Sequence, residues 1–174
     1  MSCNLAGTVG VARRARPCEP TVVRRRAAGL LLVLAAAGCG GSKQEQAVPA
    51  NAYLTAVHVD GSRVRFQFES RPQTVSTAHA PRSSLAECGS GAPIKLAGRS
   101  FVVVHFQPAA SARIDGEKVV ATYTGPKRLA GPGPVLGAAK SCDFEADLGW
   151  AIGLERRLPF HVSRDGSAVT VSFG

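Results

Sequence analysis

Three carboxylates stand at alternate positions in the last third of the chain, at Asp143, Glu145 and Asp147. On a β-strand this spacing of two would project all three side chains from one face. Carboxylate oxygens arranged in this way could hold a calcium ion or work as an acid pair. A retaining glycosidase needs two carboxyl groups about 5 Å apart in a cleft, which spacing alone does not establish. The sequence therefore favours a solvated polar face here.

Histidine and nucleophile patterns give little support to catalysis. The four histidines lie apart from one another in strand-like runs, at His58, His79, His105 and His161. No pair has a zinc-site spacing, and neither a Gly-x-Ser-x-Gly elbow nor a Ser-x-x-Lys motif is present. We expect no enzyme activity, no metal and no cofactor. The alternative that stays open is a hydrolase of envelope material that uses Asp143, Glu145 or a histidine.

An indole ring lies close to two arginines in the sequence. Trp150 is followed shortly by Arg156 and Arg157. An exposed tryptophan can stack on a sugar ring, and arginine binds anionic groups through its planar guanidinium. The alternative is that Trp150 belongs to the core, which is its more common role. Trp150, Arg156 and Arg157 are the candidate binding residues.

The amino-terminal part has the layout of a secretory signal peptide. Three arginines at positions 24–26 precede an apolar run over residues 27–37, and small residues follow it. The run has about eleven residues, whereas a membrane-spanning helix needs roughly 20. We therefore expect residues 1–38 to be removed. Residues 1–22 fit no signal peptide, which suggests that the true start is Val22 or Val23.

Cys39 follows this run directly. The segment Leu-Ala-Ala-Ala-Gly-Cys over residues 34–39 resembles the lipobox of bacterial lipoproteins. In that family the cysteine thiol is diacylglycerylated, with fatty acyl chains such as palmitate, and the cysteine becomes the new first residue. The resemblance implies a lipid anchor at Cys39 on the extracytoplasmic face of the cell membrane. Residues 40–50 are polar and lack periodicity, so residues 39–50 form the lipidated cysteine and a flexible tether. Eleven tether residues extend to at most about 36 Å and average roughly 18 Å.

Four further cysteines divide into two groups. Cys3 and Cys18 precede the expected cleavage point and are absent from the mature chain. Cys88 and Cys142 remain as an even pair outside the cytoplasm, which favours a disulfide. Two free buried thiols and an interchain bond are the alternatives.

The formal net charge of +9 does not indicate a nucleic-acid partner. Residues 1–38 hold six Arg and one Glu, so about half of the excess belongs to the removable segment. The remaining charges alternate in sign along the chain and form no basic stripe of the kind that phosphate backbones bind. We expect no nucleic acid among the partners.

Repeated hairpin signals predict the fold of residues 51–174. Asp-Gly occurs three times between alternating runs, at Asp60-Gly61, Asp115-Gly116 and Asp165-Gly166, and this dipeptide suits tight β-hairpin turns. The run over residues 63–69 alternates apolar and polar side chains, and so does that over 168–173. Further strands are predicted at 53–59, 75–79, 101–106, 119–124, 135–140, 144–148, 150–154 and 160–163. The fold class is all-β, a two-sheet β-sandwich of antiparallel hairpins.

The order of these strands carries a family resemblance. The matching pieces run through Arg63-Val64-Arg65-Phe66-Gln67-Phe68, residues 91–98, residues 101–106, Asp143-Phe144-Glu145, Ile152-Gly153-Leu154, residues 159–162 and the closing strand at 168–173. Together they resemble the AMIN-like domain of bacterial envelope lipoproteins, which is similar to the AMIN domains of cell-wall amidases and secretins. The resemblance implies a β-sandwich without known catalytic machinery and with an envelope-targeting or binding role. Cys88 and Cys142 depart from the family pattern.

These observations give one leading functional hypothesis and two alternatives. The leading one is a membrane-anchored, non-catalytic module that binds or scaffolds cell-wall polymer or an envelope protein. The others are the hydrolase described above and a purely structural lipoprotein without a ligand.

Overall fold

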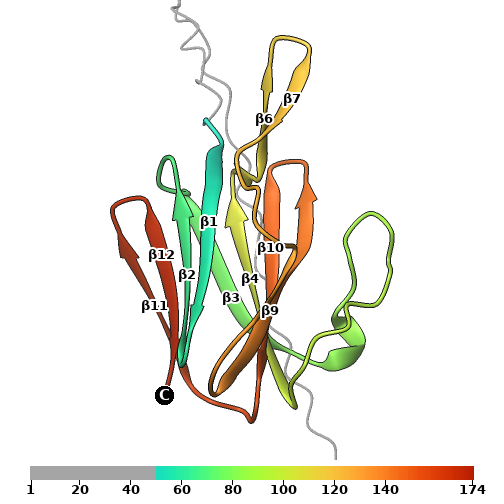
Figure 1. Cartoon of the computed structure of the whole chain (residues 1–174), viewed down its shortest axis with the longest axis vertical. Coiled ribbons are helices and arrows are strands. Elements are labelled where there is room, and N and C mark those ends of the chain that lie inside the picture. The colour runs from blue at the N-terminus through green and yellow to red at the C-terminus, as the bar shows by residue number, and fades with distance from the viewer. Residues whose placement is uncertain (1–49) are drawn as a thin grey trace, which may run out of the picture. The chain divides into compact units, whose positions relative to one another are not determined.

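The computed structural model of the chain describes residues 50–174. The predicted signal peptide, Cys39 and nearly all of the tether lie outside the described residues. Two five-stranded sheets pack face to face, and a separate two-stranded hairpin projects from one end of them (Figure 1). The predicted all-β sandwich is confirmed. No helix within residues 50–174 has the length and apolar character needed to cross a membrane.

The first sheet has the order β11-β12-β2-β1-β5. Its strands are β11 (Phe160–Asp165), β12 (Ala168–Phe173), β2 (Arg63–Phe68), β1 (Ala52–Asp60) and β5 (Ala109–Ala110). All neighbours are antiparallel except β1 and β5, which pair in parallel through Ala52 and Ala109. The sandwich is therefore built of antiparallel hairpins with one short parallel exception.

The second sheet has the order β3-β4-β10-β9-β8 and is antiparallel throughout. Its strands are β3 (Thr74–Ala80), β4 (Ser100–Gln107), β10 (Asp147–Leu154), β9 (Val135–Phe144) and β8 (Arg128–Ala130). The projecting hairpin consists of β6 (Ala112–Asp115) and β7 (Lys118–Ala121), and a 3₁₀ turn, η1, spans Arg82–Ser84.

All three Asp-Gly dipeptides form the predicted hairpin turns. They join β1 to β2, β6 to β7 and β11 to β12. The glycines Gly61, Gly116 and Gly166 have φ values of 49°, 61° and 56°, in the left-handed region that glycine adopts without steric cost. The local sequence signal was sufficient because a tight turn depends on very few residues.

The strand predicted over residues 144–148 is wrong. β9 continues to Phe144, the chain reverses at Glu145 and Ala146, and β10 begins at Asp147. Glu145 and Ala146 have φ values of 49° and 61°. Residues other than glycine adopt such positive values in turns and not within a strand. The three alternate carboxylates therefore lie on two strands and a turn, and do not share one strand face.

The main core lies between the two sheets and follows from the period-two pattern of the strands. Phe66 of the first sheet packs against Phe106 and Trp150 of the second, with ring centroids 4.8 and 5.9 Å away. Burial of each such side chain stabilises the fold by roughly 1.5–3 kcal/mol.

The outer face of the second sheet carries a smaller core beneath residues 81–99, the long connection from β3 to β4, here called the crossover. Its Leu85, Ile94 and Leu96 are buried against that face. At Gly153 the crossover lies so close that a Cβ would stand 1.9 Å from the Ala97 carbonyl oxygen. A disulfide between Cys88 and Cys142 of β9 ties the crossover down, which confirms the predicted pairing.

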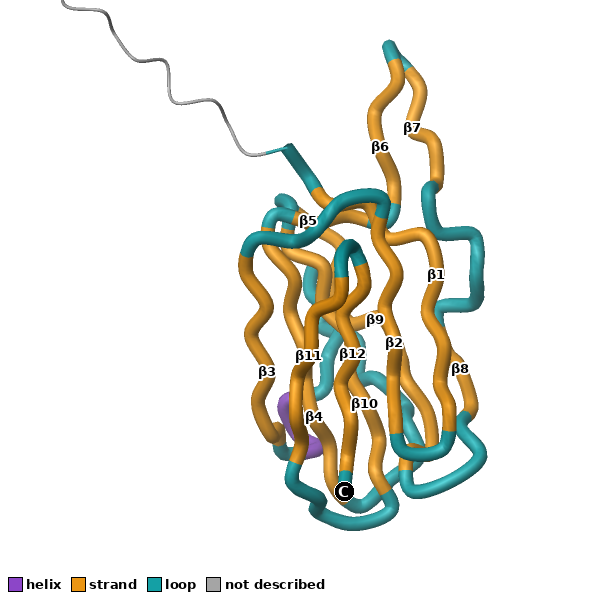
Figure 2. The backbone as a smooth tube through the Cα atoms, turned by 90° about the vertical axis from the view of Figure 1, so that its left-hand side faces the viewer, coloured by secondary structure: helices purple, strands orange, loops and turns teal. Residues whose placement is uncertain are grey.

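The two ends of the sandwich differ in what they carry. At the first, here called the entry end, the Ala52 amide donates to the Pro108 carbonyl at 2.9 Å, just before β5. The opposite, far end lies where β4 begins at Ser100, eight strand residues or about 25 Å away. Figure 2 shows the β6–β7 hairpin at the entry end and the 3₁₀ turn toward the far end.

Candidate functional site

An open groove of about 480 Å³ lies at the far end of the sandwich, between the end of β3, the start of β4 and the loop from β10 to β11. We call it the arginine groove. Its lining residues are His79, Ala80, Pro81, Arg82, Arg99, Ser100, Phe101 and Arg157. Three arginines, two from opposite ends of the crossover and one from the β10–β11 loop, thus line one groove.

Arg82 is held firmly by its surroundings. Its guanidinium donates hydrogen bonds to the carbonyl oxygens of Leu96 at 3.2 Å and Gly98 at 2.5 Å, and lies 4.6 Å from the centroid of the Phe101 ring. Gly98 has a φ of 137°, and a Cβ there would stand 2.9 Å from the Leu154 backbone. This close approach of Gly98 to β10 positions the carbonyl that Arg82 binds. The charge of Arg82 is therefore pre-organised.

The positive charge of the groove is not neutralised within the described residues. No carboxylate belongs to the lining, and none of Arg82, Arg99 and Arg157 takes part in the four ion pairs found among residues 50–174. Arginine stays protonated at any physiological pH, and its fork of donors matches carboxylate and phosphate oxygens. The groove is thus chemically suited to an anionic ligand.

A second open groove of about 470 Å³ adjoins the first along the crossover. Arg82 belongs to both grooves, and the second is otherwise lined by Leu85, Pro93, Ile94, Lys95, Leu96 and Ala97. It combines apolar side chains with one further cation. An extended ligand with anionic groups and less polar stretches could therefore follow the two grooves across Arg82.

The structure separates the three residues predicted to bind a ligand. Trp150 is 0% exposed and packs against Tyr123, whose hydroxyl donates to the Pro126 carbonyl at 2.8 Å. Trp150 is therefore a core residue and offers no ring for stacking, so its assignment as a binding residue is wrong. Arg157 lines the arginine groove, whereas the neighbouring Arg156 is exposed outside that lining.

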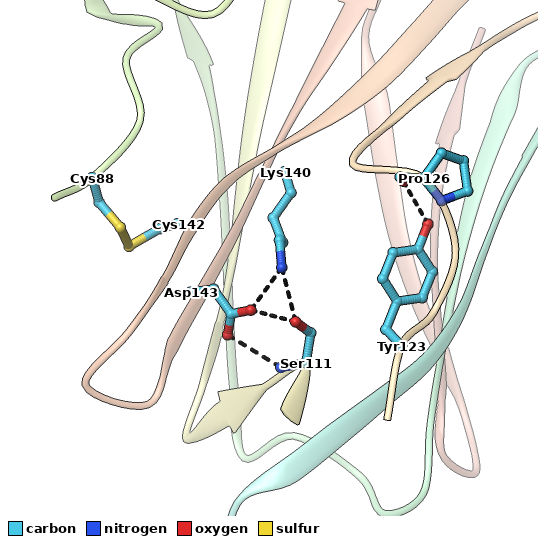
Figure 3. A network of polar contacts seen from close by, with 7 residues as sticks. All are labelled: Cys88, Ser111, Tyr123, Pro126, Lys140, Cys142 and Asp143. Atoms are coloured by element: carbon cyan, nitrogen blue, oxygen red, sulfur yellow. Dashed lines mark hydrogen bonds and ion pairs between the residues drawn. A yellow bond between two sulfur atoms is a disulfide. The ribbon is translucent and has the colours of Figure 1, made fainter. Parts of the chain in front are cut away.

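Asp143 is engaged in a compact network with Lys140 and Ser111 (Figure 3). Lys140 Nζ donates to Asp143 Oδ2 at 2.7 Å and to Ser111 Oγ at 2.8 Å, and the amide and hydroxyl of Ser111 also donate to the carboxylate. Partial burial acts to raise the pKa of Asp143, but the bonds from Lys140 and Ser111 outweigh it and hold that pKa below its ordinary value. The network fastens the segment leading into β6 to β9.

Of the other acid and histidine candidates, Asp147 and His105 lie together, and Glu145 lies apart from them. Asp147 accepts a hydrogen bond from His105 Nδ1 at 3.0 Å, and Ser141 lies nearby across Gly149. The hydroxyl of Ser141 is buried, so a substrate could not reach Ser141 Oγ for a nucleophilic attack. Glu145 lies in the exposed β9–β10 turn. Within residues 50–174 no three His, Cys, Asp or Glu side chains are grouped so that they could hold a metal ion.

The remaining histidines lie on three different strands. His58 of β1 and His161 of β11 are exposed, and His79 of β3 packs edge-on against Phe160 at 5.3 Å. His79 is the one histidine that reaches the arginine groove. In the sequence His79 stands out only as one of four separate histidines, and Arg82 and Arg99 do not stand out at all.

Comparison with protein-family models gives one match in this chain. The model described as the AMIN-like domain matches residues 50–169, which are nearly all of the sandwich. No curated protein and no solved structure matches the chain.

Proposed function

The chain belongs to the AMIN-like domain family, and from this premise we propose that it is a bacterial cell-envelope lipoprotein that binds an anionic cell-wall polymer. In this proposal residues 1–38 are removed, and acylated Cys39 holds the protein on the extracytoplasmic face of the cell membrane. The sandwich acts by binding and not by catalysis. The second candidate partner is an envelope protein, which the domain would scaffold through the same surface.

The observation that carries the proposal is the arginine groove. Three arginines without a carboxylate partner in the described residues face one open groove, and Lys95 extends the positive charge along the crossover. Charged hydrogen bonds of arginine to carboxylate or phosphate are about twice as strong as neutral ones. Cell-wall polymers carry such groups repeatedly, as stem-peptide carboxylates or phosphodiesters. A groove with several fixed cations fits this repeated charge.

The adjoining second groove supports a polymer over a small anion. Its exposed apolar residues Pro93 and Ala97 lie beside Arg82 and Lys95, whereas Leu85, Ile94 and Leu96 are buried. Sugar rings have apolar faces that such side chains can contact, while the charged groups of the same chain reach the arginines. Together the two grooves would contact a longer stretch of ligand than a single phosphate or carboxylate requires.

Arg156 and Arg157 provide a matched test of the groove. We expect Arg157→Glu to lower the affinity of the mature protein for purified peptidoglycan about tenfold or more, because a lost charged hydrogen bond costs about 1.5–3 kcal/mol. Arg156→Glu makes the same charge change one residue outside the lining and should have little effect. Co-sedimentation with purified cell-wall sacculi measures both. An equal loss in the two variants would show that net charge, and not the groove, governs binding.

The anchor is tested separately. Intact mass and membrane partitioning of the protein expressed in a bacterial host are compared between the native chain and Cys39→Ala. An acylated Cys39 as the first residue, with the variant unprocessed or released from membranes, supports the lipoprotein assignment. A soluble, unacylated native protein would remove the anchor and leave the groove's affinity for polymer as a separate question.

A further inference from the structure

The β6–β7 hairpin presents an apolar face that no described residue covers. Ile114 and Val119 stand directly opposite each other and are 78% and 76% exposed. Ala112 and Ala121 form the next pair on the same face, because side chains alternate along each strand. Adjacent exposed apolar residues of this kind are uncommon on a free surface and indicate a contact.

The other face of the hairpin carries balanced charges and one partly exposed apolar residue, Val120, opposite Arg113. Arg113 pairs with Glu69 at 3.2 Å, and Asp115, Glu117 and Lys118 surround the turn. The two acids and two bases of the hairpin cancel, so this element is not a second polyanion site. Its distinguishing property is the separation of an apolar face from a charged one.

The hairpin projects at the entry end, where the described chain begins (Figures 1 and 2). Its base follows directly on β5, which pairs with the first residues of β1. Phe144, 61% exposed, precedes the β9–β10 turn, and this turn meets β5 because the Ala109 amide donates to the Ala146 carbonyl at 2.8 Å. Two exposed apolar elements therefore lie around the point at which residue 50 enters the sandwich.

We infer that the apolar face of the β6–β7 hairpin rests on the lipid surface that holds Cys39. This inference depends on the proposed lipid anchor. The eleven residues from 40 to 50 average roughly 18 Å in length, so the entry end stays near the membrane. The lipid surface is the binding partner that we assign to this face, because the tether keeps the membrane next to it at all times.

The hairpin lies along the surface and does not enter it turn-first. Ile114 and Val119 then sink to the boundary of the acyl chains, while Asp115 and Glu117 stay among the headgroups and water. Lys118, beside the turn, can extend toward headgroup phosphates with its apolar stem on the lipid, while Arg113 stays paired with Glu69. The anchor supplies the affinity for the membrane, and the hairpin fixes the orientation of the domain on it.

Tryptophan reporters test this arrangement in the acylated, full-length mature protein on vesicles of phosphatidylethanolamine and phosphatidylglycerol. Val119→Trp places a fluorophore on the apolar face, and Glu155→Trp places one in the exposed β10–β11 loop at the far end as the matched control. The native Trp150 is fully buried and contributes a constant background. Phospholipids with brominated acyl chains quench only a tryptophan that contacts them.

We expect the Val119→Trp emission to shift to shorter wavelength on vesicles and to be quenched, with Glu155→Trp unchanged. Phe144→Trp should also be quenched, and adding Ile114→Ser and Val119→Ser should weaken that quenching. An acylated protein whose Val119→Trp is quenched no more than Glu155→Trp overturns the inference while the anchor stands. A native chain without acylated Cys39 overturns both. A Val119→Trp shift that depends on protein concentration without vesicles would assign the face to a second copy and overturn the lipid contact.

Discussion

Lys140 Nζ lies 2.7 Å from Asp143 Oδ2, and both side chains are partly shielded from water where β9 meets the segment before β6. Removing the carboxylate charge leaves the ammonium group without its partner. We expect Asp143→Asn to lower the free energy of unfolding by about 1–3 kcal/mol at neutral pH. Glu145→Gln, an acid-to-amide change in the exposed turn two residues away, is the matched control and should have little effect in urea unfolding.

The same pair makes stability depend on pH in acid. The pKa of Asp143 is below its ordinary value of 3.8 in the folded protein. Its contribution is therefore fully present above pH 3.8 and is lost as the pH falls through the lower folded value. The difference in unfolding free energy between the native protein and Asp143→Asn should shrink only below about pH 4. A difference that already shrinks between pH 7 and 5 would contradict the lowered pKa.

The disulfide should stabilise both the fold and the arginine groove. Cys88 and Cys142 are 54 residues apart in sequence, and closing such a loop contributes about 4 kcal/mol on the chain-entropy model. We expect the double variant Cys88→Ser, Cys142→Ser to lose roughly this amount in denaturant unfolding. Because the crossover carries Arg82 and ends at Arg99, binding to peptidoglycan should fall as well. Unchanged binding would mean that the crossover keeps its place without the disulfide.

Arg82 and Arg99 should respond differently to replacement by lysine. Lysine cannot bond to the carbonyl oxygens of Leu96 and Gly98 together while its charge lies over Phe101. Arg82→Lys should therefore weaken polymer binding several-fold and cost about 1 kcal/mol of stability, although the net charge is unchanged. Among residues 50–174 no side-chain hydrogen bond or ion pair is found for Arg99, so Arg99→Lys should retain most of the affinity. Equal losses in sedimentation would argue against a fixed Arg82.

Gly149 should tolerate no side chain. A Cβ at this position would stand 2.8 Å from Ser141 Oγ and 3.1 Å from both Cys142 Cβ and His105 Cε1. Gly149→Ala should lower the melting temperature, since overpacking of this kind costs about 1–3 kcal/mol. Gly174→Ala, where nothing lies within 4 Å, is the control. A melting temperature as high as that of the control would show that Ser141 and His105 can move aside.

The parts of the fold that depend on neighbouring residues could be predicted from the sequence. The three Asp-Gly turns and the alternating strands around them are of this kind. The reversal at Glu145-Ala146 could not be predicted, because neither residue is a usual turn former and the alternation continues through both. The burial of Trp150 also depends on the opposite sheet, which supplies Phe66.

The arginine groove was missed because its residues are distant in sequence. His79, Arg82, Arg99 and Arg157 meet only after β3 pairs with β4 and the β10–β11 loop returns beside them. The sequence nevertheless contains one signal for this groove. Arg82 and Arg99 stand just outside two predicted strands that are consecutive in sequence, and consecutive antiparallel strands bring such positions to the same end of a sheet.

Because the arginine groove lies at the far end of the sandwich, its height above the lipid has an upper limit. A sandwich about 25 Å long and a tether of at most about 36 Å limit the height of the groove above the lipid to roughly 60 Å. A polymer strand held there would be kept within this layer, and strands further out would be beyond reach. Whenever the β6–β7 hairpin is off the lipid, inserting or deleting tether residues between Cys39 and Ala50 would raise or lower this ceiling by up to about 3.5 Å per residue, without altering the groove itself.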